Sequence, residues 1–248
     1  MKKKKSSKKT VRIADISLRK AARIAGFGYL VSFIFAFYAG DSKVSFGPGV
    51  SATIASNNMA NEVLFRSGIA SWLIVFILDV VVAWALYILL IPVNKSLSLL
   101  AAWFRLIFVA ISGVALLPVL IALQLSKGAD YLTVFTADQL QAQVILFLNA
   151  HTDLTLIAWV FFGLHIFFLG YLIFKSGYIP RVLGVFLIVA AIGYQINSFA
   201  GVLLPNIPEE SRMLLIGPAI IAESALLLWL VFRGGKIEQQ DNGALESA

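Results

Sequence analysis

The chain has 248 residues, of which 60% are hydrophobic and 13% are charged, and its mean hydropathy is +0.89. Soluble domains average about 45 to 50% apolar and about 25% charged residues, so the composition excludes soluble globular, disordered and fibrous proteins. The absence of cysteine excludes disulfides, thiolate metal sites and cysteine nucleophiles. We therefore predict an all-α protein, a polytopic membrane helix bundle whose solvent is lipid.

Six apolar segments are each long enough to cross a membrane once. A bilayer core of about 30 Å requires roughly 20 apolar residues in a helix. The six segments cover residues 21–39, 68–90, 101–125, 154–174, 182–204 and 213–232. We therefore predict a six-helix transmembrane domain over residues 21–232, between a basic tail, residues 1–20, and a polar tail, residues 233–248.

Two further apolar segments, residues 51–61 and 136–150, contain too many polar residues to span a membrane. The second begins with Thr136 and has Gln139 three positions later, which is the pattern of a capping box. We predict that both segments form short helices lying in the membrane interface, in the outer loops. Asp153 is then expected to cap the span that follows, and His151 to be solvated at the outer interface.

The distribution of Lys and Arg favours one orientation in the membrane. With the N-terminus inside, sixteen of the 20 basic residues flank the inner ends of the spans, and ten of these sixteen lie near the N-terminus. This excess predicts that both termini are cytoplasmic. We expect the basic tail to contact anionic lipid rather than nucleic acid.

Three ionisable residues lie in the middle of apolar spans. A charged residue at mid-membrane costs about 2.5 to 3.5 kcal/mol on insertion scales, so such residues are functional candidates. At 1.5 Å per residue, Asp79, His165 and Glu223 all lie about 15 Å above the inner boundary. Residues at one depth on different helices can meet inside the bundle. Two carboxyl groups could not both stay ionised there, so one would stay protonated or share a proton with His165.

Further polar residues extend this candidate cluster. Arg105 begins about two turns closer to the inner boundary, and its long side chain could reach either Asp79 or the surface. Asn197 belongs to a stripe of small residues that favours close helix packing, and Gln195 lies beside it. The candidate cluster comprises Asp79, Arg105, His165, Gln195, Asn197 and Glu223. It either binds a ligand or only holds the helices together.

No recognised catalytic or cofactor motif occurs in the chain. His151 and His165 are the only two histidines, and fourteen residues along one helix separate them by about 21 Å, too far to share a metal or a haem. The patterns HExxH and GxSxG, the P-loop and the Rossmann glycine pattern are all missing. We therefore predict no cofactor, no metal site and no catalytic residue, and an intramembrane enzyme is the least favoured class.

Four stretches of the chain resemble a family of bacterial membrane proteins. They read NEVLFRSGIA, LDVVVAWALYILLIPVNKSLSLLAAWFRL, FFGLHIFFLGYLIFKSGYIPRVLGVFLIVAAIGYQINSFA and GPAIIAESALLLWLV. The family is domain-of-unknown-function family four-three-eight-six (DUF4386-like), and the resemblance covers about residues 23–232. It implies a six-helix protein of the bacterial plasma membrane and carries no activity with it.

Two functions are compatible with these observations. A small transporter or proton-linked permease would use Asp79, His165 and Glu223 as titrating groups, because transporters bind substrates near mid-membrane. Arg105 would then be their counter-ion. A structural or regulatory membrane protein would use the same residues only to fix the helices. Replacing Asp79 or Glu223 by its amide should abolish function without unfolding the protein only in the first case.

Overall fold

The computed structural model describes residues 16–41, 61–127, 130–204, 206–208, 211–212, 214–234 and 237. These residues form six α-helices, one short 3-10 helix and no strand. The α-helices are α1 (Leu18–Asp41), α3 (Glu62–Leu90), α4 (Lys95–Ser126), α5 (Ala137–Ser176), α6 (Arg181–Leu203) and α8 (Gly217–Arg233), and the 3-10 helix is η1 (Asp130–Leu132). The predicted all-helical fold class is therefore confirmed for the described part of the chain.

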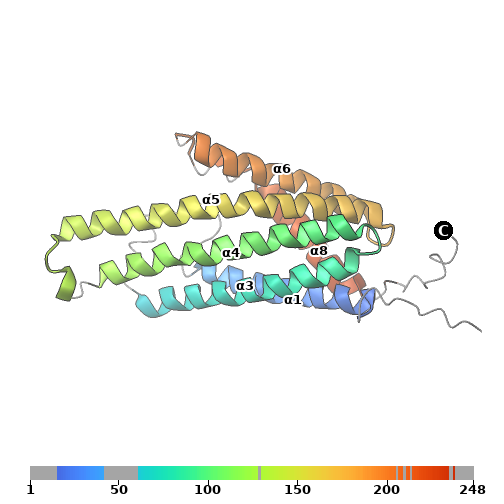
Figure 1. Cartoon of the computed structure of the whole chain (residues 1–248), viewed down its shortest axis with the longest axis horizontal. Helices are drawn as coiled ribbons and strands as arrows, with labels where there is room; N and C mark the ends of the chain where they lie inside the picture. Colours follow the sequence, from blue (N-terminus) through green and yellow to red (C-terminus); the bar gives the residue numbers. More distant parts are fainter. Residues whose placement is uncertain are drawn as a thin grey trace, which may run out of the picture.

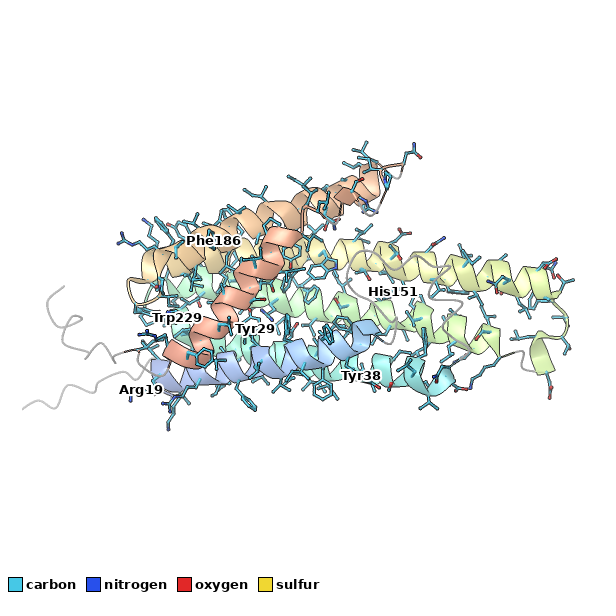
Figure 2. All side chains as sticks on the ribbon, turned by 180° about the vertical axis from the view of Figure 1, so that it is seen from behind. Arg19, Tyr29, Tyr38, His151, Phe186 and Trp229 are labelled. Atoms are coloured by element: carbon cyan, nitrogen blue, oxygen red, sulfur yellow. The ribbon has the colours of Figure 1, made fainter. Side chains whose placement is uncertain are left out.

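The six helices form a closed ring in which each helix packs against two neighbours. Going round the ring, α1 contacts α3, α3 contacts α4, α4 contacts α5, α5 contacts α6, α6 contacts α8, and α8 contacts α1. Figure 1 shows α3, α4 and α5 side by side, with α6 inclined away from α5. In Figure 2, seen from behind, α8 crosses obliquely between α6 and α1. Every helix can therefore contribute side chains to a common interior.

The outward faces of the helices are apolar, as expected for contact with lipid. All helices except α8 are long and apolar enough to cross a membrane, and α8 has 17 residues. Large apolar side chains stay exposed on these faces, among them Phe27 at 68%, Phe37 at 76% and Ile77 at 67%. A soluble helix would show a polar outer face instead. The protein is therefore a helical membrane bundle.

Side-chain caps begin four of the helices: Ser17 accepts the backbone N–H of Lys20 in α1, and the other three caps lie on α3, α4 and α5. The side chains of Asn61 and Asn94 each accept a backbone N–H in the first turn of α3 and α4. Thr136 and Gln139 form the predicted capping box of α5. These bonds satisfy N–H groups that lack a partner within the helix. Gly177, with a φ of 73°, ends α5 in a left-handed conformation that glycine adopts without strain.

The prediction of a separate interfacial helix over residues 136–150 is wrong. Helix α5 runs unbroken for 40 residues and includes this segment. Residues 137–162 contain no glycine or proline to interrupt a helix. Val144 and Leu148 are buried in an apolar cluster with residues of α3 and α4. Packing against α4 therefore extends the helix beyond the apolar run that marked the predicted span.

This extension changes the roles of two residues near the middle of α5. Asp153 lies exposed inside the helix and does not cap it. His151 is buried instead of solvated, and its Nδ1 lies 2.7 Å from the carbonyl oxygen of Ala115 on α4. The other predicted interfacial helix, residues 51–61, lies outside the described residues except for Asn61. Most of the two predicted tails, residues 1–20 and 233–248, also lies outside them.

Helices α5 and α6 cross closely at a pair of glycines. A Cβ atom on Gly184 would lie 2.6 Å from the carbonyl oxygen of Gly170, and a Cβ on Gly170 would lie 2.7 Å from that of Gly184. Only glycine fits at both positions, because a larger residue would push the two backbones apart. This contact holds α6 against α5, and its residue on α5, Gly170, lies five residues after His165.

Candidate functional site

One polar side chain from each of the six described helices lies at the same level of the ring. Each is ten to thirteen residues from the end of its helix nearest the α5–α6 turn, which corresponds to about 15 to 20 Å along the helix axis. They are Tyr29 on α1, Asp79 on α3, Arg105 on α4, His165 on α5, Tyr194 on α6 and Glu223 on α8. We call these six residues the interior cluster.

Arg105 is the centre of one half of the interior cluster. Its Nη2 donates a hydrogen bond to Oδ1 of Asp79 at 2.7 Å, and its Nη1 donates to the hydroxyl oxygen of Tyr29 at 2.6 Å. The same Nη1 lies 3.1 Å from Nε2 of His165. Arg105 is only 2% exposed. The ion pair is therefore shielded from solvent, where removing either partner would leave an uncompensated buried charge.

The two partners of His165 determine which of its ring nitrogens carries hydrogen. Nε2 faces the guanidinium of Arg105, which can only donate a hydrogen bond, and Nδ1 lies 2.8 Å from the carbonyl oxygen of Ala101, which can only accept one. The imidazole therefore carries its hydrogen on Nδ1 and is neutral. The neutral imidazole of His165 contacts the guanidinium of Arg105 and helps to hold it in place.

Glu223 and Tyr194 form the other half of the interior cluster. The hydroxyl group of Tyr194 donates a hydrogen bond to Oε1 of Glu223 at 2.5 Å. Among the residues described, Glu223 makes no ion pair. Tyr194 is buried, whereas Glu223 is partly exposed. This second carboxyl group is therefore held by one neutral partner and has no cation of its own.

Aromatic rings fill the space between the two halves of the cluster. The ring centroid of Phe162 lies 5.9 Å from that of His165 and 5.3 Å from that of Tyr194, and Arg105 Cζ lies 5.6 Å from the Phe162 centroid. Trp159 stacks on Tyr194 with a centroid distance of 4.9 Å. Such packing holds the polar groups in fixed positions. The two halves are therefore close enough to interact without being directly bonded.

Four of the six predicted candidates belong to the interior cluster: Asp79, Arg105, His165 and Glu223. The equal depth of Asp79, His165 and Glu223 was the observation that selected three of them. The fourth, Arg105, does not lie two turns below Asp79, because α4 begins at Lys95 and not at residue 101. Arg105 therefore lies level with Asp79 and bonds it directly.

The other two candidates, Gln195 and Asn197, face different neighbours. Nε2 of Gln195 donates to the carbonyl oxygen of Val160 at 2.8 Å, across the contact between α5 and α6. Asn197 is fully buried, and neither polar atom of its amide has a hydrogen-bond partner among the described residues. It lies one turn from Gly193 and one turn from Gly201, both of which pack closely against the segment that precedes α8. Neither residue is a member of the interior cluster.

Sequence reasoning missed Tyr29 and Tyr194. Tyr194 is the only tyrosine in α6, and Tyr29 is one of two in α1. Buried tyrosine hydroxyl groups normally require a hydrogen-bond partner. A tyrosine at the same depth as three ionisable residues is therefore the signal that could have identified both.

The chemistry of the interior cluster favours proton binding over metal binding. Among the described residues, no three His, Asp or Glu side chains gather where they could hold a metal ion. Glu223 offers a carboxyl group beside the hydroxyl group of Tyr194, whereas the carboxyl group of Asp79 is ion-paired with Arg105. A carboxyl group that is not held in an ion pair is the better suited of the two to bind and release a proton.

The part of this chain that matches a known protein family includes all six residues of the interior cluster. The family profile described as a domain of unknown function, DUF4386, matches residues 24–234. An uncharacterised protein of Archaeoglobus fulgidus is 32% identical over 169 residues, which are 67% of this chain and 83% of the relative. No solved structure matches. The resemblance seen in the sequence is confirmed, and the chain belongs to the DUF4386 family.

Proposed function

We propose that this protein is a proton-linked permease for small solutes. The observation that supports this is the difference between the two carboxyl groups of the interior cluster. Asp79 is ion-paired with Arg105, whereas Glu223 bonds only the neutral Tyr194. Transporters bind substrates and coupling ions near mid-membrane, between helices. The cluster lies about 15 to 20 Å from the helix ends nearest the α5–α6 turn, which is about half the thickness of a bilayer core or slightly more.

Glu223 is the proton carrier in this proposal. In its protonated form it is neutral and stays bonded to Tyr194. After losing the proton, its negative charge is attracted toward Arg105, which cannot deprotonate in a protein. Because Glu223 lies on α8 and Arg105 on α4, this attraction draws the two helices together. Binding and release of the proton are thereby coupled to movement of α8.

Helix α8 is the element best suited to such movement. It is the shortest of the described α-helices, with 17 residues, and no side chain caps its first turn at Ile216. Among the described elements, its main packing partners are α6 and α1. By contrast, α3, α4 and α5 are joined through the bonds of Arg105 to Asp79 and His165. The proposed cycle therefore moves one short helix against a fixed group of longer ones.

The first test is infrared difference spectroscopy of the protein in lipid between acid and alkaline pH. We expect a carboxyl band that appears on acidification, is absent in Glu223→Gln, and is present in a control variant, Asp153→Asn, whose side chain is exposed. A spectrum in which Glu223→Gln changes no carboxyl band would contradict the proposal. This measurement requires no knowledge of the transported solute.

The second test measures proton movement directly. Purified protein is placed in vesicles that contain a pH-sensitive dye, and sugars, amino acids, organic cations and organic acids are added one at a time. The expected result is that one class changes the internal pH with the unaltered protein and with Asp153→Asn, but not with Glu223→Gln. Proton movement that persists in Glu223→Gln would remove that residue from the mechanism.

A structural role for the interior cluster is the second candidate. The observation that favours it is Arg105, whose bonds tie α4 to α1, α3 and α5. In that case no carboxyl group would titrate, and replacing Glu223 by its amide would destabilise the protein as much as replacing Asp79 does. The infrared experiment therefore separates the two candidates.

We also propose that the protein lies in the bacterial plasma membrane with both termini cytoplasmic, and that its basic tail contacts anionic lipid. The excess of Lys and Arg at the inner ends of the spans supports this orientation. Labelling of single cysteines introduced at Lys8 and Ser247 of this cysteine-free chain tests it. We expect a membrane-impermeant reagent to react with both only after the cell membrane is opened.

A further inference from the structure

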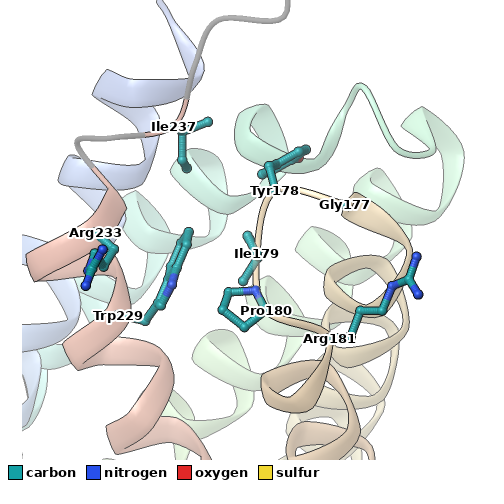
Figure 3. A pocket seen from close by; sticks show the side chains of 8 residues that line it. All are labelled: Gly177, Tyr178, Ile179, Pro180, Arg181, Trp229, Arg233 and Ile237. Atoms are coloured by element: carbon teal, nitrogen blue, oxygen red, sulfur yellow. The ribbon is translucent and has the colours of Figure 1, made fainter.

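A cavity of about 540 Å³ lies between the α5–α6 turn and the end of α8. Figure 3 shows the indole of Trp229 facing Ile179 and Pro180, with the side chains of Arg233 and Arg181 on the two flanks. Cavities of roughly 300 to 1,000 Å³ are typical of small-ligand sites. This cavity lies at the helix ends, where its two lining residues on α8 are six and ten residues from Glu223, so it is separate from the interior cluster.

The surroundings of the cavity are positively charged. Arg181 and Arg233 are exposed, and neither has an ion-pair partner among the described residues. Lys175 lines a neighbouring cavity of about 380 Å³, and Tyr178 borders both cavities. The carboxylates described outside the interior cluster lie toward the opposite end of the bundle: Glu62, Asp130, Asp138 and Asp153. Among the residues that the structure describes, the charged side chains near the cavity are therefore cations, which favour an anion there.

The start of α6 adds backbone donors to these cations. Pro180 precedes the first residue of α6 and supplies no side-chain cap, so N–H groups of the first turn remain for a ligand. The positive end of the helix dipole lies at the same place. Tyr178 is already occupied, because its hydroxyl group donates to the carbonyl oxygen of Leu89 at 2.5 Å and burial raises its pKa. Tyr178 therefore lines the cavity as an uncharged side chain.

We propose that this cavity binds the phosphate group of an anionic phospholipid, with Arg181 and Arg233 as its charge partners. Lipid is favoured over a soluble phosphate by the exposed aromatic side chains that follow or precede the two arginines in the chain. Phe186, five residues after Arg181 on α6, and Phe232, next to Arg233 on α8, are 47% and 72% exposed, and they offer apolar surface for acyl chains. Trp229 is the residue type enriched where headgroups meet hydrocarbon. Basic pockets between helices at this level bind anionic headgroups in other membrane proteins.

The test compares lipid binding to two variants of the full chain that lose the same charge. One is Arg181→Gln with Arg233→Gln. The matched control is Arg19→Gln with Arg23→Gln, which removes two exposed arginines from α1; Arg19 lies at the same end of the bundle as Trp229 (Figure 2). Native mass spectrometry counts bound phosphatidylglycerol and phosphatidylcholine on each protein, with inorganic phosphate added as competitor.

We expect the cavity variant to bind phosphatidylglycerol about tenfold more weakly, while the control keeps its affinity and phosphatidylcholine binds all three proteins alike. Equal loss in both variants would assign the effect to general surface charge and overturn the proposal. No loss in either variant would also overturn it. Displacement of the lipid by inorganic phosphate would identify the site as one for soluble anions and overturn the assignment to lipid.

A second measurement uses the unaltered protein, so it does not depend on the folding of an arginine variant. Phosphatidylglycerol with brominated acyl chains should quench tryptophan fluorescence more than brominated phosphatidylcholine. The difference should disappear in Trp229→Phe, which leaves the other four of the five tryptophans. Equal quenching by the two lipids would contradict a specific headgroup site beside Trp229.

Discussion

The two carboxyl groups of the interior cluster lie at the same depth in opposite surroundings. Asp79 is buried and ion-paired with Arg105, which is itself bonded to Tyr29 and His165. Glu223 is partly exposed and bonded to Tyr194 alone. Depth along a helix thus predicts which residues meet, whereas the partners that they find decide which of them is fixed and which can change its charge.

The largest expected effect comes from Asp79→Asn. This change leaves the guanidinium of Arg105 buried without a counter-charge, so we expect the free energy of unfolding to fall by about 3 to 5 kcal/mol. Denaturant titration of the purified protein in micelles measures it. Adding Arg105→Gln to the same chain should recover part of the loss. A single Asp79→Asn variant as stable as the parent would show that the ion pair does not anchor the helices.

A smaller loss is expected from Arg105→Lys. Lysine keeps the charge opposite Asp79, but its single ammonium group cannot bond Asp79, Tyr29 and His165 in the geometry of a planar guanidinium. Losing about two interhelical hydrogen bonds should lower the free energy of unfolding by about 1 to 2 kcal/mol. The same titration measures this. If Arg105→Lys lowers the free energy of unfolding as much as Asp79→Asn does, the planar geometry of the guanidinium contributes more to stability than the positive charge at this position.

On the other side of the cluster, Tyr194→Phe should have a modest effect. It removes one hydrogen bond to Glu223 and keeps the stacking on Trp159. Interhelical hydrogen bonds in membrane proteins average about 0.6 kcal/mol, and we expect a loss of about that size. Infrared spectra of this variant should also show a shifted Glu223 carboxyl band. An unshifted band would mean that Tyr194 does not bond Glu223 in the membrane.

The smallest effect on stability is expected from Glu223→Gln. The amide oxygen of glutamine still accepts the hydrogen bond of Tyr194, and no cation loses its partner. The free energy of unfolding should therefore change by about 0.5 kcal/mol or less, while solute-driven proton movement is lost. Unfolding comparable to that of Asp79→Asn would erase the contrast between the two carboxyl groups and favour a purely structural cluster.

Sequence alone predicted the class of fold and the centre of the site because both follow from helix geometry. The rise per residue is constant, so Asp79, His165 and Glu223 could be assigned one depth before any contact was known. The contact between Arg105 and Asp79 was left open, since it depends on where α4 begins. Hydropathy identifies the apolar residues that can contact lipid, but it does not identify the residue at which a helix starts or ends.

Other features of the structure depend on packing between distant segments, which hydropathy does not encode. Helix α5 continues through residues 137–153 because Val144 and Leu148 pack in an apolar cluster with α3 and α4. His151 is buried for the same reason, since its imidazole faces the carbonyl oxygen of Ala115. Asn197 was grouped with the candidates on polarity alone, yet it lies between Gly193 and Gly201, which pack against the segment before α8. The three- and four-residue spacing predicted the stripe of small residues on α6, but it did not predict which segment packs against that stripe.

Closure of the ring makes the order of synthesis matter. The first and last described helices, α1 and α8, contact each other, and translation proceeds from the N-terminus. Tyr29, Asp79, Arg105 and His165 therefore emerge from the ribosome before Glu223. Until α8 inserts, the bundle has an open seam between α1 and α6, with a charged centre behind it. A chain stopped before Gly217 therefore leaves this seam open to lipid, whereas a chain that includes α8 closes it.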